Sequence, residues 1–385
     1  MNESKPGAQQ PLDDIRLVEI GTSVAAPYAS WILAALGADV IKVESPNKGD
    51  DTRHWGRPFG DGISSYFHAL NQDKRGITVD FKDEAERSWL REFLIAETDV
   101  VIQNLRPGRI EAYGLGATGL IEENPRLIYC NLGAFGHRGP MKDLPGYDLL
   151  MQAYGGLMST TGEEGRLPVR VGTSIIDMGT GLWCAVGILA ALKRRAETGQ
   201  GCVVDASLYE TALAWMANPA AAVQIDGRNP RRLGSGVNGM APYQAYRCSD
   251  GYLVVAAAND NLFERLCGVL GHPEWTGDRR FATNPKRCDN REALNALIEP
   301  IFSPQPRQVW RHRLDQAGVP NAPVQNTLEM IADAQMKALG MLRGLTGDGP
   351  RLMGIPLSFD GQRPPLPRLA PSLGEHNKDI KKGGD

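Results

Sequence analysis

Strand-like and helix-like runs alternate along the first 205 residues, and this alternation constrains the fold more than any other feature of the sequence. Short apolar runs typical of buried strands occupy 15–20, 38–44, 99–103 and 127–131. Helical patterns separate them, notably at 27–36, with a proline in the first turn, and at 84–96. Strands that alternate with helices indicate a parallel sheet covered by helices on both faces. We therefore predict an α/β fold.

Length and patterning divide the chain further. Its 385 residues correspond to about two or three domains. We predict a large domain over 12–205, a linker over 206–226, a smaller α+β domain over 227–330, and a return segment over 331–385 that packs on the large domain. In the smaller domain, 252–256 is typical of a strand, and 261–270 and 291–302 of helices. The proline-rich tail after Gly349 lacks helical periodicity, which favours a course across a surface.

Charge and composition exclude several classes of function. The formal net charge is −3 and no long basic or acidic block occurs, which argues against nucleic acid or an anionic membrane as a partner. None of the six cysteines forms a C-x-x-C pair and the six histidines show no ligand spacing, so we predict no metal site. The segment 1–11 is polar without a signal-peptide core, and the apolar run 182–192 is too short for a bilayer. We therefore expect a cytoplasmic protein.

Two G-x-G-x-x-G strings, Gly114–Gly119 and Gly234–Gly239, invite a dinucleotide-binding interpretation. That interpretation requires a strand before the glycines and a helix after them. The first string follows a helical stretch, and the second follows a polar segment and continues into Ala241-Pro242. Neither context fits, so the sequence does not favour an NAD-dependent oxidoreductase.

Asp177 lies in the pattern best suited to covalent chemistry. An apolar, strand-like stretch over 169–176 meets a long apolar helix that runs from about 178 to Arg195. A helix N-terminus stabilises a carboxylate and offers N–H groups to an oxyanion, and Gly179 and Gly181 would leave room for a bulky substrate. The alternative interpretation is that Asp177 is only an N-cap, a position where aspartate is favoured.

The sequence resembles the class III CoA-transferase family over nearly its whole length. The segments that carry the resemblance are VAAP (24–27), LGADVIKVE (36–44), GDDTR (49–53), NLRPG (104–108), GYDLLMQ (146–152), GTSIID (172–177), GILAAL (187–192) and LGEH (373–376). The resemblance implies a large Rossmann-like domain, a smaller domain and an interlocked homodimer. It implies that Asp177 attacks an acyl-CoA, that coenzyme A and acyl-CoA are substrates, and that no cofactor is permanently bound.

The same resemblance implies where CoA contacts the chain. The implied contacts are Val24, Ala25, Arg53, Val79, Lys82, Asn104, Leu105, Arg106 and Tyr147. Lys82, Arg106 and Arg53 would supply charge for the phosphates, although the first and last are also typical of solvated surface charge. Relatives carry a phosphate-binding arginine where this chain has Ala112, and Arg109, one turn earlier, is the candidate substitute. Gly234–Gly239 is shorter than the glycine-rich loop of formyl-CoA transferase.

Other functions remain open at this stage. An α-methylacyl-CoA racemase would share the fold, but that branch uses a histidine where this chain has Tyr147, and tyrosine ordinarily titrates near about 10. A CoA-binding protein without catalysis is a further alternative. Within the transferases, 49–59 and 146–154 look most like the branch that acts on short dicarboxylates such as succinyl-CoA with glutarate. Arg53, Arg57 and Arg170 are candidates for binding the second carboxylate.

Overall fold

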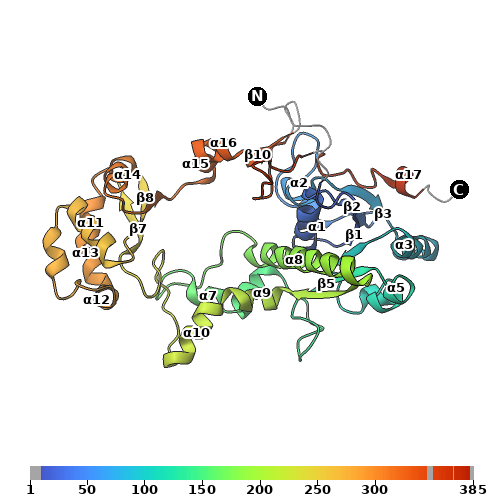
Figure 1. Cartoon of the computed structure of the whole chain (residues 1–385), viewed down its shortest axis with the longest axis horizontal. Coiled ribbons are helices and arrows are strands. Elements are labelled where there is room, and N and C mark those ends of the chain that lie inside the picture. The colour runs from blue at the N-terminus through green and yellow to red at the C-terminus, as the bar shows by residue number, and fades with distance from the viewer. Residues whose placement is uncertain (1–9, 345–349, 367, 382–385) are drawn as a thin grey trace. The chain divides into compact units, whose positions relative to one another are not determined.

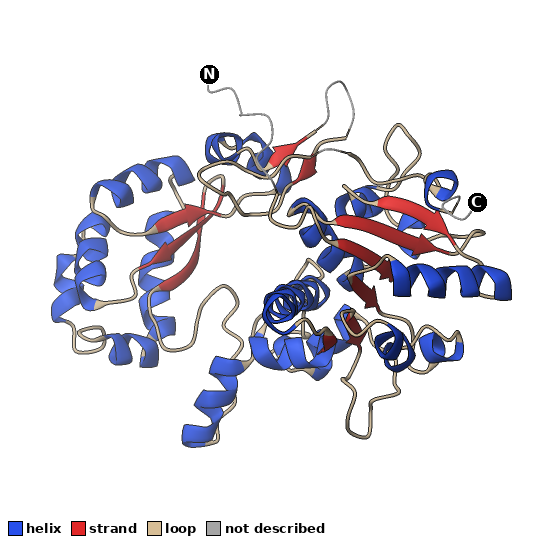
Figure 2. Ribbon diagram, turned by 45° about the vertical axis from the view of Figure 1, so that its right-hand side comes forward, coloured by secondary structure: helices blue, strands red, loops and turns tan. Residues whose placement is uncertain are grey.

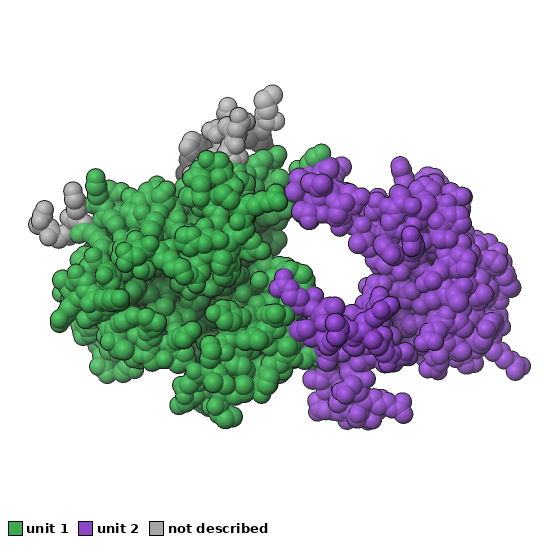
Figure 3. All heavy atoms as spheres, turned by 180° about the vertical axis from the view of Figure 1, so that it is seen from behind, with its two compact units in different colours: residues 1–156, 171–217, 335–385 green, residues 157–170, 218–334 purple. Residues whose placement is uncertain are grey.

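The computed structural model describes residues 10–344, 350–366 and 368–381, so most of the polar segment 1–11 lies outside the described part of the chain. The chain divides into two compact units, coloured separately in Figure 3. The large unit comprises 1–156, 171–217 and 335–385, and the small unit comprises 157–170 and 218–334. The segment 157–170, which the sequence places in the large domain, therefore belongs to the small unit.

A six-stranded parallel sheet forms the centre of the large unit, which confirms the predicted α/β class (Figures 1 and 2). Its order is β3-β2-β1-β4-β5-β6. The strands are β1 (Arg16–Ile20), β2 (Asp39–Glu44), β3 (Arg75–Thr78), β4 (Val100–Gln103), β5 (Ile128–Gly133) and β6 (Cys202–Ser207). The chain builds outward from β1 in one direction and then from β4 in the other. A crevice between the loops after β1 and β4 follows from this reversal, and such crevices are where open α/β sheets bind ligands.

Helices cover both faces of the sheet because successive strand residues point to opposite sides. Val18 packs with Leu90 of α3 on one face, and Glu19 accepts a hydrogen bond from Ser30 of α1 on the other. The helices of this unit are α1 (Ala25–Ala35), α2 (Ser65–Asn71), α3 (Glu84–Ala96), α4 (Arg109–Ala112), α5 (Ala117–Glu123), α6 (Asp148–Tyr154), α8 (Ile175–Thr198), α9 (Leu208–Trp215), α17 (Asn377–Ile380) and the 3₁₀ helix η1 (Asp51–His54).

The helix α8 is longer than the sequence indicates. Its 24 residues are, by length and composition alone, enough to cross a membrane, whereas the apolar run counted from the sequence covers only 182–192. Core helices of soluble proteins meet the same criterion, and 44% of its most apolar window is buried inside the chain. Cys184, Ala185 and Ile188 are fully or almost fully buried, which makes α8 a packing element of the large unit.

The small unit is an antiparallel sheet with helices around its own apolar core. Its sheet has the order β7-β8-β9, and the core includes Phe263, Phe281, Ile298 and Phe302. The strands are β7 (Tyr243–Cys248), β8 (Gly251–Ala256) and β9 (Asn321–Pro323). The helices are α7 (Leu157–Thr160), α11 (Asp260–Leu270), η2 (Pro273–Gly277), α12 (Asn284–Asp289), α13 (Arg291–Phe302), α14 (Arg307–Gln316) and α15 (Thr327–Ala332).

The connections between the units contain more regular structure than a linker. Residues 206–226, predicted as a linker, form the end of β6, α9 and α10 (Ala217–Asp226). Ser207 explains where α9 begins, because its side chain accepts a hydrogen bond from the N–H of Glu210. On the return, α16 (Ala334–Leu339) precedes the short antiparallel pair of β10 (Leu342–Arg343) and β11 (Leu352–Met353).

The described part of the tail packs along β3. The Gly76 N–H donates to His376 Nδ1 at 3.1 Å, and the Thr78 N–H donates to Asn377 Oδ1 at 2.9 Å. These bonds satisfy an edge strand that would otherwise present unpaired backbone groups. The LGEH segment thus has a structural role beside the sheet.

Candidate active site

A cavity of about 470 Å³ lies in the large unit at the carboxyl end of the sheet, in the crevice where the strand order reverses. The loops after β1, β2, β4 and β5 line it, together with the start of α8. Seven of the residues selected from the sequence lie on its wall: Val24, Ala25, Asn104, Leu105, Arg106, Tyr147 and Asp177. The structure therefore brings together the Val24 loop, the Asn104 loop and Asp177, which are far apart in sequence.

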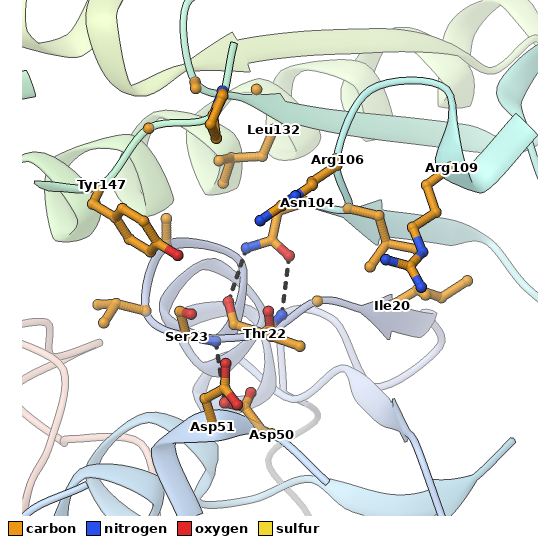
Figure 4. A pocket seen from close by; sticks show the side chains of 18 of the residues that line it. Ile20, Thr22, Ser23, Asp50, Asp51, Asn104, Arg106, Arg109, Leu132 and Tyr147 are labelled. Atoms are coloured by element: carbon orange, nitrogen blue, oxygen red, sulfur yellow. Dashed lines mark hydrogen bonds between the residues drawn. The ribbon is translucent and has the colours of Figure 1, made fainter. Parts of the chain in front are cut away.

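The loop after β1 is held by side chains from three other segments, two of which, those of Asn104 and Asp50, are drawn in Figure 4. The N–H of Thr22 donates to Asn104 Oδ1 at 3.0 Å, and Asn104 Nδ2 donates back to the Thr22 carbonyl at 2.8 Å. The Ser23 N–H donates to Asp50 Oδ1 at 3.1 Å, and Lys42 Nζ donates to the Gly21 carbonyl at 3.0 Å. These contacts hold Ser23 at φ 67°, a conformation that non-glycine residues rarely adopt.

This loop presents the start of α1 to the cavity. Val24, the N-cap residue, makes no side-chain capping bond, and both Val24 and Ala25 line the cavity. Amide groups at an uncapped helix start are suited to an anionic oxygen. The wall therefore combines the backbone N–H groups of a helix start with a fixed loop shape.

A buried ionic network lies under the loop. Glu19 accepts from Lys42 at 2.7 Å and from Lys74 at 2.8 Å, and Asp50 lies 2.9 Å from Lys42. Burial acts to raise the pKa of Glu19, but the two ammonium groups outweigh it and lower that pKa. Burial lowers the pKa of Lys74 to about 8. Two cations thus balance two anions, and the network fixes Asp50 where it can hold the Ser23 amide.

Arg106 and Arg109 supply the positive charge of the cavity wall. Both line the cavity, and Arg109 Nε donates to the Tyr113 hydroxyl at 2.9 Å. Tyr113 stacks on Phe81 with ring centroids 5.0 Å apart, and both rings line the cavity. Arg109 thus places in the cavity wall the guanidinium group that Ala112 lacks. Two guanidinium groups beside a stacked aromatic pair suit a phosphorylated, aromatic ligand.

Three predicted contacts do not line the cavity. Arg53 donates from Nε and Nη2 to the two oxygens of Glu44, at 2.8 and 2.6 Å, and its Nη2 also donates to the Pro371 carbonyl. Val79 is fully buried in the core next to β3, and the exposed Lys82 lies outside the lining. The guanidinium of Arg53 is used within the protein, because Glu44 satisfies it with two parallel bonds.

Asp177 lies on the cavity wall as the third residue of α8, after the N-cap residue Ser174. It is therefore not the N-cap that the alternative interpretation proposed. Burial, and then the charge of Asp148, raise the pKa of Asp177 to about 7. A helix N-terminus would lower this pKa, but the nearest amides, those of Ile176 and Asp177, donate to Asp148 instead. Tyr147, 64% exposed, extends toward the same cavity (Figure 4).

The approach to Asp177 differs from the prediction. Residues 169–174 form no strand, and α8 already begins at Ile175. The Ile176 and Asp177 N–H groups donate to Asp148 Oδ1 at 2.8 and 3.2 Å, which explains the early start of the helix. The apolar run 169–176 is thus a loop followed by the first helical turn.

Gly179 and Gly181 do not make room for a substrate, as the sequence suggested. A Cβ at Gly179 would lie 2.8 Å from the Trp215 ring, and one at Gly181 would lie 2.6 Å from the Ala25 carbonyl. Both glycines therefore permit close packing of α8 against α9 and α1. Neither belongs to the cavity lining.

Sequence reasoning missed several residues that line or support the cavity. Thr22, Ser23, Asp50, Tyr113 and Phe81 line it, and Asp148 supports it. Asp50 and Asp148 lie inside the GDDTR and GYDLLMQ segments, so those segments were the available signal. The partners of each carboxylate are distant in sequence, which is why the signal did not reveal their roles.

The described residues form neither a metal site nor a dinucleotide-binding loop. Within 10–344, 350–366 and 368–381, no three His, Cys, Asp or Glu side chains are grouped to hold a metal ion. Gly114–Gly119 lies between α4 and the start of α5, and Gly234–Gly239 lies in the loop before β7. Neither string connects a strand to a helix, so neither has the context of a dinucleotide-binding loop.

Comparison with known proteins shows similarity over nearly the whole chain. The model of CoA-transferase family III matches residues 12–377. An acyl-CoA transferase of Fusarium pseudograminearum is 38% identical, covering 98% of this chain and 86% of the relative. A succinate–glutarate CoA-transferase of Agrobacterium fabrum is 36% identical, covering 97% and 96%. The crystal structure of a CaiB/BaiF family protein from Brucella suis has a TM-score of 0.87 and 40% identity, covering 97% and 99%.

Proposed function

We propose that this chain, which belongs to CoA-transferase family III and is a CoA-transferase, moves CoA from succinyl-CoA to a short dicarboxylic acid. One observation carries the proposal: a half-buried carboxylate with a raised pKa, Asp177, shares a cavity with two guanidinium groups and uncapped helix amides. Such a cavity offers a nucleophile for the thioester and contacts for an anionic nucleotide.

The proposed reaction proceeds by covalent exchange at Asp177. The Asp177 carboxylate attacks the thioester carbonyl, the C–S bond breaks, and CoA leaves as a thiolate while a mixed anhydride forms. The thiolate then attacks the Asp177 acyl carbon, which releases the donor acid as a carboxylate and leaves an aspartyl-CoA thioester. The acceptor carboxylate attacks that thioester, and the freed thiolate attacks the acceptor's carbonyl. Asp177 is regenerated as a carboxylate, and no oxidant or external energy source is needed.

CoA would lie along the wall from Arg109 to Asp177. Arg106 and Arg109 would bind its phosphates, and the Phe81–Tyr113 pair would contact the adenine. The pantetheine arm would follow the Thr22–Ala25 loop toward Asp177. This placement keeps the predicted contacts Asn104, Leu105 and Tyr147 and replaces Arg53, Val79 and Lys82 with Arg109 and the two rings.

The dicarboxylate preference rests on the substrates named for the Agrobacterium relative. A second carboxylate needs a partner, and of the three arginines considered Arg53 is already paired with Glu44. Neither Arg57 nor Arg170 lines the cavity, and the basic side chains among the described lining residues, Arg106 and Arg109, are the ones proposed to bind the CoA phosphates, so the preference rests on the relative alone. We expect succinate and glutarate to be used at least about tenfold better, by kcat/KM, than a monocarboxylate of equal length, or about 1.4 kcal/mol. Equal use would remove the case for a second carboxylate site.

We also propose that the chain forms a homodimer. Leu182, Trp183 and Val186 of α8 are 46–47% exposed, and Leu149 and Leu150 of α6 are exposed as well. A group of large apolar side chains in solvent is typical of a surface covered by a partner, and the family resemblance implies a second, interlocked copy. Sedimentation should show a dimer that persists on dilution. A monomer at micromolar concentration would contradict this proposal.

The decisive experiment combines a substrate screen with a trap. Purified protein is incubated with succinyl-CoA and a panel of acids, and new acyl-CoA species are identified by mass spectrometry. Hydroxylamine added during turnover should convert Asp177 to a hydroxamate. Asp177→Asn should bind CoA but transfer none, and full transfer by that variant would refute the mechanism. Exchange of the α-proton of a branched acyl-CoA without new thioesters would indicate the racemase instead.

A further inference from the structure

The first turn of α8 is capped by a residue from another helix. Ser174, the N-cap residue, makes no side-chain capping bond. Instead Asp148, the first residue of α6, is 6% exposed and accepts from the Ile176 and Asp177 amides at 2.8 and 3.2 Å. The turn that carries Asp177 is therefore anchored by a carboxylate 29 residues earlier.

A second buried side chain fixes that carboxylate. Gln152, one turn further along α6, is fully buried and donates from Nε2 to Asp148 Oδ2 at 2.6 Å. Its Oε1 accepts from the Val171 N–H at 2.8 Å. Asp148 and Gln152 thus hold both ends of the segment 171–177. Each polar atom of the pair has one defined role as donor or acceptor.

We infer that Asp148 and Gln152 form a positioning pair that sets the orientation of the Asp177 carboxyl for attack on the thioester. The inference rests on the proposed function of Asp177. Amides at a helix start ordinarily solvate a nearby carboxylate, and here a neighbouring carboxylate accepts from them. Asp177 is thereby denied these donors, and its carboxylate keeps the basicity that a nucleophile needs. Burial and the Asp148 charge raise its pKa in the same direction.

The hydrogen-bond pattern allows a variant that breaks the contacts of Asp148 and Gln152 to be compared with a double variant that restores them. Asp148→Asn keeps an acceptor for the two amides but turns an amide donor toward Gln152 Nε2. If the Gln152 amide rotates so that its Oε1 accepts from that donor, its Nε2 group faces the Val171 N–H, which is also a donor. The double variant Asp148→Asn with Gln152→Glu removes the conflict, because the carboxylate introduced at position 152 accepts both from the amide introduced at position 148 and from the Val171 N–H. All contacts of the pair are restored, and the negative charge moves one turn away.

We expect Asp148→Asn to lower kcat at least about 100-fold with the KM for acyl-CoA within threefold, because the cavity contacts are unchanged. The double variant should recover kcat to within about tenfold of wild type. The matched control is Asn259→Ala, which removes an N-cap bond to Leu262 in the small unit and should lower stability without changing kcat. Full activity in Asp148→Asn, or no recovery in the double variant, would overturn the inference.

Hydrogen exchange separates this inference from the proposed function. The Ile176 and Asp177 amides should exchange at least about tenfold faster in Asp148→Asn and return to the wild-type rate in the double variant. Unchanged exchange in Asp148→Asn would overturn the positioning role whatever Asp177 does. Failure of hydroxylamine to label Asp177 in wild-type protein would instead refute the nucleophile. A reduced Asp177 labelling rate in Asp148→Asn, restored in the double variant, would support both.

Discussion

Replacing Asp177 with asparagine should stabilise the large unit, and the gain should depend on pH. Burial and Asp148 raise the pKa of Asp177 from 3.8 to about 7. Because the folded state holds the proton more tightly than the unfolded chain, stability falls as pH rises from about 4 to about 7. Above that range the whole penalty is present. Asp177→Asn removes the ionisation and hence the penalty.

The magnitude follows from the difference in pKa. The two values differ by about three units (7 − 3.8), and one unit corresponds to about 1.4 kcal/mol, which gives an upper value of about 4 kcal/mol. Asp177 is only half-buried, so solvent screening reduces this value, and we expect about 2–3 kcal/mol at pH 8. At pH 4 the gain should fall to about 0.5 kcal/mol, since little of the penalty is present there.

Urea unfolding at pH 8 and pH 4 measures this gain in the free energy of unfolding. Because the chain has two units that can unfold separately, hydrogen exchange of the strands of the large unit reports on that unit alone. The comparison between the two pH values cancels any effect of the amide that is independent of charge. Asp143→Asn, at an exposed aspartate, is the control and should change stability by less than about 0.5 kcal/mol at both. Equal gains for Asp177→Asn at pH 4 and pH 8 would refute the reasoning.

Two further predictions concern the rate and the packing of α8. With acyl-CoA well below its KM, kcat/KM should fall about tenfold per pH unit below about 7, because in the proposed mechanism only the ionised Asp177 attacks; a kcat/KM unchanged down to pH 5 would contradict this. Gly181→Ala should destabilise the large unit by about 1–3 kcal/mol, since its Cβ would lie 2.6 Å from the Ala25 carbonyl. Gly268→Ala, in a helix with open space, should instead stabilise by about 0.5–1 kcal/mol, and urea unfolding measures both.

The sequence predicted the centre of the sheet better than its edges. The strands β1, β2, β4 and β5 are apolar runs because both of their faces are buried. β3 is a four-residue RGIT segment, and β6 alternates half-buried and exposed positions at the other edge. Neither edge strand has a continuous apolar run, so neither was predicted. The strand β9 was missed because its three residues, NAP, are too few to form an apolar run.

The sequence selected several residues that the fold brings to one cavity. Asp177, Asn104 and Arg106 line that cavity, and their catalytic and CoA-binding roles stay predictions. Arg53 does not line it, because its pairing with Glu44 depends on a contact that local patterning cannot reveal. The roles of Asp148 and Asp50 likewise depend on backbone groups brought close only by the fold.

The Thr22–Ser23 loop leads to a last prediction, because its strain and its hydrogen bonds can be removed separately. Ser23 is held at φ 67°, which costs a non-glycine residue about 1 kcal/mol, and glycine adopts this conformation without that cost. Ser23→Gly should therefore be stabilising by up to about 1 kcal/mol and leave the CoA dissociation constant within about twofold, since Asp50 still binds the Ser23 amide. Asn104→Ala removes both bonds to Thr22 and should weaken CoA binding at least about tenfold in calorimetric titration. If Ser23→Gly weakens binding as much as Asn104→Ala does, the strained backbone itself, rather than the contacts that hold it, determines the shape of the cavity.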